Sequence, residues 1–172
     1  MILKVYQDTR EKRPLLFPET IELGGRLHTV EVIKQELITG DYLLDYETPA
    51  AMIERKGSID ELYQNLFTKD RARFFRSLER IKESPAVCYL LLDFRWWSCE
   101  PRKGTVDELL DALWDVVVRF DLRPLAMGDY PQPAARRQYG GQLLRLLWSH
   151  ERPKLRNQLI TNIGGENVNP NL

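Results

Sequence analysis

The chain has 172 residues, a length that fits one domain with a hydrophobic core and leaves little room for two. About 43% of the residues are hydrophobic and 29% are charged, and the equal basic and acidic counts of 25 exclude a uniformly basic surface, so any cationic surface must be local. The N-terminus becomes charged too early for a signal peptide, and the longest apolar run is too short for a membrane span; we therefore expect a soluble protein of the cytoplasm, or of the nucleus in a eukaryote, with no membrane partner.

Strands dominate the first third of the chain, and helices alternate with strands after it. Hydrophobic periodicity predicts strands over residues 2–7, 29–37, 42–46 and 51–56, helical sequence over 58–83, a strand over 87–93, a helix over 106–120, a strand over 123–127 and a helix over 133–150. This order is typical of an α/β fold whose central mixed sheet carries helices on both faces. Beyond Arg152 the sequence becomes polar, so we expect a domain over residues 1–152 and a flexible tail over 153–172.

Local signals sharpen three of these expectations. The Pro-containing turn at residues 47–49 predicts a β-hairpin. Ser58 and Glu61 have the spacing of a helix N-terminal capping box, and a kink is expected near Thr68. The apolar run around Cys88 is typical of a strand buried on both faces, and neither cysteine lies in a Cys-x-x-Cys pair, which argues against a structural zinc site.

An acidic pair and a lysine are predicted to meet on the hairpin. Side chains alternate along a strand, so Glu54 and Lys56 share one face while Arg55 points to the other. If the numbers of paired residues sum to an odd value near 97, Asp41 lies opposite Lys56 and diagonal to Glu54, with cross-strand neighbours about 5 Å apart. A slip of one residue would move Asp41 to the other face.

Two carboxylates at this spacing suit a hard cation such as Mg²⁺, which prefers oxygen ligands, polarises phosphodiesters and lowers the pKa of bound water. Lys56 could then hold the attacking water or stabilise negative charge that grows on the phosphate. The alternative is structural, because Glu and Lys two residues apart often form a solvated strand face and Gly-Asp often begins a turn.

Five sequence elements, in order, resemble the XPF-type structure-specific endonucleases. They are Asp8-Thr9-Arg10-Glu11 after an apolar strand, Gly40-Asp41, Glu54-Arg55-Lys56, Asp60 after three further residues, and an arginine-rich helix before a buried strand. The resemblance covers about the first 95 residues. It implies the restriction-endonuclease-like core of the PD-(D/E)XK superfamily and Mg²⁺- or Mn²⁺-dependent hydrolysis of branched, forked or flapped DNA, in repair or recombination.

The resemblance also implies roles for the acidic residues and the lysine. Asp41 and Glu54 would be metal ligands, and Lys56 would be the catalytic lysine. Asp8 would lie at the metal or just behind its ligands.

Further matched residues are expected to support this site. Arg10, Arg55 and Asp60 occupy positions that the family needs, through salt bridges and DNA contact, and the role of Glu11 is left open. An alternative for Arg10 and Asp60 is an ordinary ion pair that steadies the hairpin.

The segment over residues 69–82 is the most basic part of the chain, with six basic and two acidic residues, a net charge of +4. Arg73, Arg76 and Arg80 recur on one helix face, and Arg71 belongs to the same segment. Such a row can contact DNA phosphates without sequence preference. The alternative is a solvated helix face.

Apolar stripes indicate what the helices cover. Phe74, Leu78 and Ile81 are predicted to face the core. Residues 143–148 are also very apolar and either cover the core or form a dimer surface, since the resembled family works as homodimers or heterodimers. For Trp96-Trp97, packing in the core or at a subunit interface is favoured over a stacking platform for unpaired bases.

Two other functions stay open. The chain could be a non-catalytic DNA-binding subunit of an active partner, although the intact Asp41, Glu54 and Lys56 argue against this, or a Holliday-junction or restriction-type nuclease on the same core. Family members often carry a helix–hairpin–helix domain or a helicase, and these 172 residues contain neither motif. We therefore expect substrate recognition to differ or to come from a partner.

Overall fold

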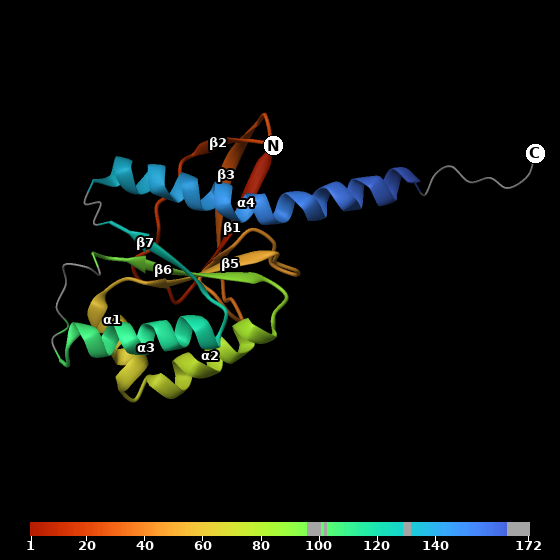
Figure 1. Ribbon diagram of the computed structural model, residues 1–172. Helices are drawn as coiled ribbons and strands as arrows, with labels where there is room; N and C mark the ends of the chain where they lie inside the picture. The colour runs from red at the N-terminus through yellow and green to blue at the C-terminus, as the bar shows by residue number, and fades with distance from the viewer. Residues whose placement is uncertain (96–100, 102, 129–131, 165–172) are drawn as a thin grey trace, which may run out of the picture.

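The computed structural model describes residues 1–95, 101, 103–128 and 132–164, with side chains described up to Pro153. Seven strands form one sheet in the order β2-β3-β1-β4-β5-β6-β7. Helices α1, α2 and α3 cover one face and α4 lies across the other (Figure 1), which confirms the predicted α/β fold. The elements are β1 (Ile2–Asp8), β2 (Thr20–Leu23), β3 (Arg26–Gln35), β4 (Tyr42–Leu43), β5 (Ala51–Lys56), α1 (Ile59–Phe67), α2 (Arg71–Glu83), β6 (Val87–Asp93), α3 (Val106–Arg119), β7 (Arg123–Met127) and α4 (Pro133–Gly164).

The centre of the sheet is buried on both sides because helices cover each face. All residues of β5 are buried, as are the five central residues of β6. Cys88 and Leu90 pack towards α1, α2 and α3, whereas Tyr89 and Leu91 pack beneath α4. The strand predicted over residues 87–93 is confirmed, and Cys88 is a core residue.

The hairpin is antiparallel as predicted, but its register differs from the predicted one. Tyr42 pairs with Ile53 and Leu43 with Met52, so the numbers of paired residues sum to 95. The sum is still odd, and the shift brings Asp41 beside Glu54 instead of opposite Lys56. The pairing is irregular at this end, where the Asp41 N–H donates to the Ile53 carbonyl at 2.7 Å.

The strand predicted over residues 42–46 is only two residues long. Its early end has a local cause: the Asp45 carboxylate accepts hydrogen bonds from the backbone N–H groups of Glu47 and Thr48 at 3.1 and 3.2 Å. Such side-chain bonds compete with strand pairing and close a turn. At the other end, Gly40 has a φ of 73°, and a Cβ there would lie 3.3 Å from Met52, so glycine is required directly before Asp41.

The helical sequence predicted over residues 58–83 forms two helices. Thr68 ends α1 in an extended conformation, and its hydroxyl bonds back to the Gln64 carbonyl. At the start of α1, the Ser58 side chain accepts from the Glu61 N–H at 3.1 Å, as predicted. The Glu61 carboxylate, however, accepts from the N–H of Gly57, so the predicted capping box is formed only in part.

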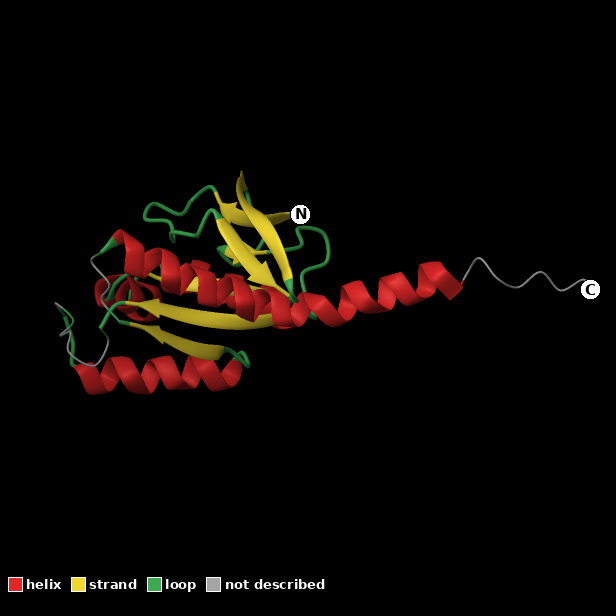
Figure 2. Cartoon of the chain, turned by 90° about the horizontal axis from the view of Figure 1, so that it is seen from above, coloured by secondary structure: helices red, strands yellow, loops and turns green. Residues whose placement is uncertain are grey.

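Helix α4 is longer than predicted. The helix predicted over residues 133–150 continues as helical backbone through Pro153 to Gly164 and extends beyond the sheet (Figure 2). Gly140 lets α4 approach the preceding loop, because a Cβ there would lie 2.0 Å from the Leu16 carbonyl oxygen. The division into a domain over 1–152 and a flexible tail stays a prediction.

The remaining expectations have mixed outcomes. Leu143, Leu144 and Leu147 of α4 are buried against the sheet, so the apolar stretch covers the core. The strand β2 was not predicted. Trp96 and Trp97 lie outside the described residues. No helix among the described residues is both long and apolar enough to span a membrane.

Candidate active site

Asp41 lies where β1 and β5 come together at one end of the sheet. The Asp8 N–H, at the end of β1, donates to the Asp41 carbonyl at 2.9 Å. The Arg55 N–H, in β5, donates to the Asp41 carboxylate oxygen Oδ2 at 2.6 Å. The other oxygen, Oδ1, accepts no hydrogen bond from the residues that the structure describes. One side of the Asp41 carboxylate is thus fixed by backbone, and the other is available to a ligand.

Glu54 and Lys56 form a buried ion pair beside Asp41. The Lys56 ammonium donates to Glu54 Oε1 at 2.7 Å, and the two residues are only 7% and 5% exposed. On its other side the ammonium lies 4.5 Å from the centre of the Phe74 ring of α2, a cation–π contact. Both residues point towards the face covered by α1, α2 and α3, as strand alternation predicts.

The charges of this cluster are not balanced. Burial raises the pKa of Asp41 well above its ordinary value, and the nearby Glu54 carboxylate raises it further, although Lys56 and the Arg55 N–H partly compensate. Burial alone would lower the pKa of Lys56, but the charges of Glu54 and Asp41 outweigh that effect and raise it. Two carboxylates therefore share one cation, and a second cation would relieve their repulsion.

Asp41 and Glu54 fit a magnesium or manganese ion. Mg²⁺ is commonly held by one or two carboxylates and keeps waters or substrate phosphate oxygens in its other positions. Among the described residues, no group of three or more His, Cys, Asp or Glu side chains could hold a metal. The cluster therefore offers two carboxylate ligands, with an excess of negative charge. Asp8 does not add a third ligand.

Asp8 is buried just behind the cluster, with its carboxylate fully engaged. Oδ1 accepts from the Arg10 N–H and Nε at 2.7 and 2.8 Å, and Oδ2 accepts from an Arg10 terminal nitrogen and the Leu37 N–H at 2.5 and 3.2 Å. Burial would raise the pKa of Asp8, but these hydrogen bonds together lower it. Direct metal binding by Asp8 would require breaking them, so its geometry favours a position behind the metal ligands.

Arg10 therefore pairs with Asp8, and its guanidinium also donates to the Leu37 carbonyl at 2.7 Å. The alternative partner considered from sequence, Asp60, lies half-buried in the first turn of α1, where a carboxylate interacts favourably with the helix dipole. Arg10 thus holds the segment that follows β1 against Asp8 and against Leu37, which lies in the loop that leads to Asp41.

Arg55 points to the opposite face of β5, towards α4, as predicted. Its guanidinium donates to Asp93 Oδ2 at 2.8 and 2.5 Å and to Glu11 Oε1 at 3.0 Å, and Arg136 of α4 contacts the same Asp93 oxygen at 3.4 Å. Gly57 allows the guanidinium to pass, because a Cβ there would lie 3.2 Å from it. This network anchors the strand whose backbone holds Asp41.

Sequence reasoning missed several residues around the site. Asp93 and Arg136 were not singled out, although an aspartate that ends an apolar strand was a usable signal. The contact of Phe74 with Lys56 was also missed, because Phe74 was assigned to the core alone. Glu61 was assigned only to a cap, yet its negative charge also contributes to the raised pKa of Lys56.

Helix α2 places the predicted basic residues on its exposed surface. Phe74, Leu78 and Ile81 are buried, which confirms the predicted apolar stripe. The four arginines of the segment are exposed, namely Arg71, Arg73, Arg76 and Arg80. Arg73 lies 3.9 Å from Asp70, a weak contact at the surface.

Comparisons with known proteins support the fold. No protein-family model matches the chain, and no curated protein matches it in sequence. In its architecture the chain is similar to XPF from Aeropyrum pernix, with a TM-score of 0.57 and 21% identity over 96% of this chain and 75% of that one. For XPF from Aeropyrum pernix in complex with DNA, the TM-score is 0.54 and the identity 23%, over 90% of this chain and 66% of that one. The chain therefore has the XPF-type nuclease fold that the sequence predicted.

Proposed function

We propose that this protein is a metal-dependent DNA nuclease that hydrolyses phosphodiester bonds. The observation that carries the proposal is the cluster of Asp41, Glu54 and Lys56, in which two carboxylates and one ammonium meet on one face of the sheet. The likeness to XPF, of which one structure is a complex with DNA, supports DNA as the substrate. The sequence motifs that resemble the XPF-type endonucleases fall on this same cluster.

In this proposal, Asp41 and Glu54 hold a Mg²⁺ or Mn²⁺ ion. When bound, such an ion polarises the scissile phosphate and lowers the pKa of a water molecule. Lys56 stays protonated beside Glu54 and stabilises negative charge on the phosphate in the transition state. Glu54 and Phe74 contact the Lys56 ammonium from two sides and hold it in place before the substrate binds. Lys56 therefore loses little further side-chain freedom when it contacts the substrate.

The surrounding residues have positioning roles. Asp8 and Arg10 fix the loop that presents Asp41, Arg55 fixes β5, and Asp60 supports the start of α1. The exposed arginines of α2 contact DNA phosphates; these are Arg71, Arg73, Arg76 and Arg80. Because such contacts are independent of sequence, the nuclease selects its substrate by shape.

We propose branched, forked or flapped DNA as the substrate, in repair or recombination, and an assembly with a second nuclease subunit, identical or different. The chain spans 75% and 66% of the two XPF chains that it matches. A contribution of the partner subunit to substrate recognition is part of the proposal. The proposed location is the cytoplasm, or the nucleus in a eukaryote.

The test is cleavage and binding of labelled fork and flap DNA by wild type and Glu54→Ala. The variant should lose cleavage by about 10³-fold or more in Mg²⁺ or Mn²⁺, because a metal ligand and the partner of Lys56 are removed together. Its DNA affinity should change little, since the arginines of α2 remain. Undiminished cleavage by Glu54→Ala contradicts the proposed chemistry. A wild type that binds forks but cuts no DNA in any divalent metal favours a non-catalytic DNA-binding subunit.

A further inference from the structure

Helix α2 carries basic residues on two different faces. Successive residues turn by about 100° around an α-helix. Arg73, Arg76 and Arg80 therefore project together away from the body, and we call them the outward stripe. Arg71 and Lys82 lie about 170° and about 150° around the helix from the centre of that stripe, on the side that faces α3. The structure thus separates Arg71 from the arginines with which the sequence grouped it.

Acidic residues separate these two basic faces. On the exposed surface between them lie Glu79 and Glu83, at helix positions that fall between the outward stripe and Lys82. A single phosphate backbone that follows the outward stripe would have to cross these carboxylates to reach Lys82 on the second face. Because like charges repel, the two basic faces do not form one continuous track.

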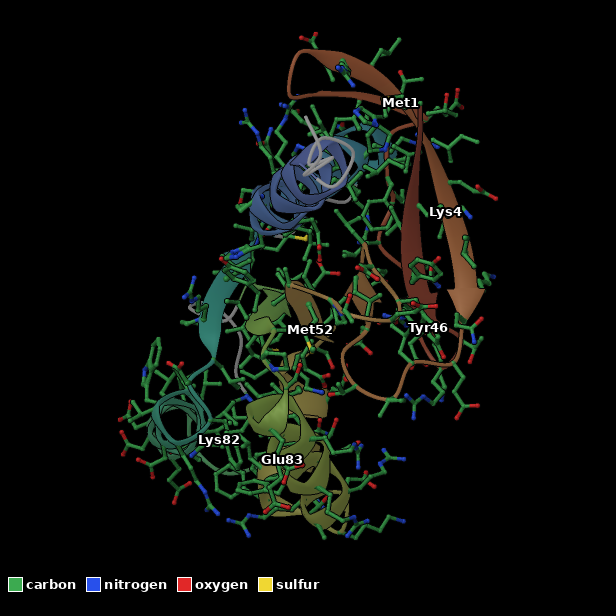
Figure 3. All side chains as sticks on the ribbon, turned by 90° about the vertical axis from the view of Figure 1, so that its right-hand side faces the viewer. Met1, Lys4, Tyr46, Met52, Lys82 and Glu83 are labelled. Carbon is green, nitrogen blue, oxygen red and sulfur yellow. The ribbon has the colours of Figure 1, made fainter. Side chains whose placement is uncertain are left out.

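The second face meets α3 at an aromatic ring. The Arg71 guanidinium lies 4.3 Å from the centre of the Phe75 ring, and Arg119 at the end of α3 lies 5.6 Å from the same centre. The Lys82 ammonium donates to the Arg119 carbonyl at 2.9 Å, and Figure 3 shows Lys82 at the end of α2 beside α3. We call this group, Arg71, Phe75, Lys82 and Arg119, the α2–α3 seam.

The chemistry of the seam favours an anion. Guanidinium groups that lie over a ring use their faces for that contact and keep N–H donors at their edges free. Neither Arg71 nor Arg119 forms an ion pair with an acidic residue in the part of the chain that the structure describes. Two guanidinium groups over one ring repel one another, and a phosphate with its oxygen acceptors would both relieve the repulsion and match the guanidinium edges.

We infer that the α2–α3 seam binds the phosphate backbone of a second arm of branched DNA, while the outward stripe binds the first arm. This inference rests on the proposed function only in taking DNA as the ligand. The catalytic cluster lies on the same side of the sheet, where Phe74 of α2 contacts Lys56. Two separate tracks on this helix would give the protein a preference for a junction over a linear duplex.

The experiment measures binding of a three-way fork and of a linear duplex of equal length, by fluorescence anisotropy in EDTA over a series of salt concentrations. The variants are Arg119→Glu in the seam and Arg76→Glu in the outward stripe. Arg26→Glu is the matched control, because Arg26 is an exposed arginine on the β2–β3 hairpin, remote from α2. Circular dichroism checks each fold, and Arg119→Gln replaces Arg119→Glu if the charge reversal unfolds the protein.

Arg119→Glu should weaken fork binding by about 10-fold and reduce the slope of log affinity against log salt by about 1, with linear duplex affected less than about two-fold. Arg76→Glu should weaken both DNAs, and Arg26→Glu neither. Unchanged fork binding in Arg119→Glu, or an equal loss on both DNAs, overturns the seam as a second-arm site. Because no cleavage is measured, these outcomes are independent of the Glu54→Ala result, which tests the proposed chemistry.

Discussion

Strand β5 carries buried charges on both of its faces, and the two sets differ in how completely they are paired. On the α4 side, Arg55 and Arg136 face the carboxylates of Glu11 and Asp93, two cations for two anions. On the opposite side, two carboxylates share Lys56 as their single cation. The first set is balanced within the protein, whereas the second has one carboxylate in excess, which a proton or a metal ion can neutralise. A balanced network holds the strand in place, whereas an unbalanced one provides a binding site.

Breaking the balanced side should affect stability most. Arg55→Met leaves Glu11 and Asp93 buried without their main cation, which should lower the free energy of unfolding by about 3–5 kcal/mol. Urea denaturation at pH 7 measures this loss, with Arg26→Met as an exposed control that should change stability by less than about 0.5 kcal/mol. A loss for Arg55→Met no larger than the control's would show that the network does not anchor β5.

Removing the cation from the unbalanced side should affect activity and metal binding. Lys56→Met should reduce cleavage by about 10²–10³-fold, because the positive charge next to the phosphate is lost. The same variant should bind Mn²⁺ more tightly than wild type, since Asp41 and Glu54 then lack a competing cation. Cleavage rates and calorimetric Mn²⁺ titrations measure the two effects. Weaker Mn²⁺ binding in Lys56→Met would contradict the charge account.

The raised pKa of Asp41 predicts how stability without metal depends on pH. In the folded protein this carboxyl holds its proton to a higher pH than in the unfolded chain, where its pKa is about 3.8. Its contribution to stability is therefore fully present below pH 3.8 and is lost as pH rises through the folded pKa. Denaturation of wild type and Asp41→Asn in EDTA should show this loss in wild type alone, and Mg²⁺ should reduce it. If wild type and Asp41→Asn lose stability in parallel as the pH rises, the pKa of Asp41 is not raised in the folded protein.

Much of this arrangement could be predicted from the sequence, because it depends on local patterns. Strand alternation correctly placed Glu54 and Lys56 on one face and Arg55 on the other, and apolar periodicity gave β6, α3 and β7. The hairpin register could not be fixed in this way, since the sequence did not show that Asp45 ends β4 early.

The contacts missed by sequence reasoning are those between distant segments. Arg136 follows Asp93 by 43 residues, and Phe74 follows Lys56 by 18, so their contacts depend on how α4 and α2 pack on the sheet. The split of the α2 arginines into two faces likewise needed the position of α3. The end of α4 was missed for a different reason, because Pro153 and the polar composition were interpreted as the end of a helix that in fact continues.

The most direct test of the account is Mn²⁺ binding to wild type, Asp41→Asn and Glu54→Gln, measured by calorimetry without DNA. Asp41 and Glu54 are proposed to share one ion, so wild type should bind one Mn²⁺ per chain, and each variant should bind it at least about 10-fold more weakly. If either variant binds Mn²⁺ as tightly as wild type does, the two carboxylates do not hold a common ion, and the proposed metal site is wrong.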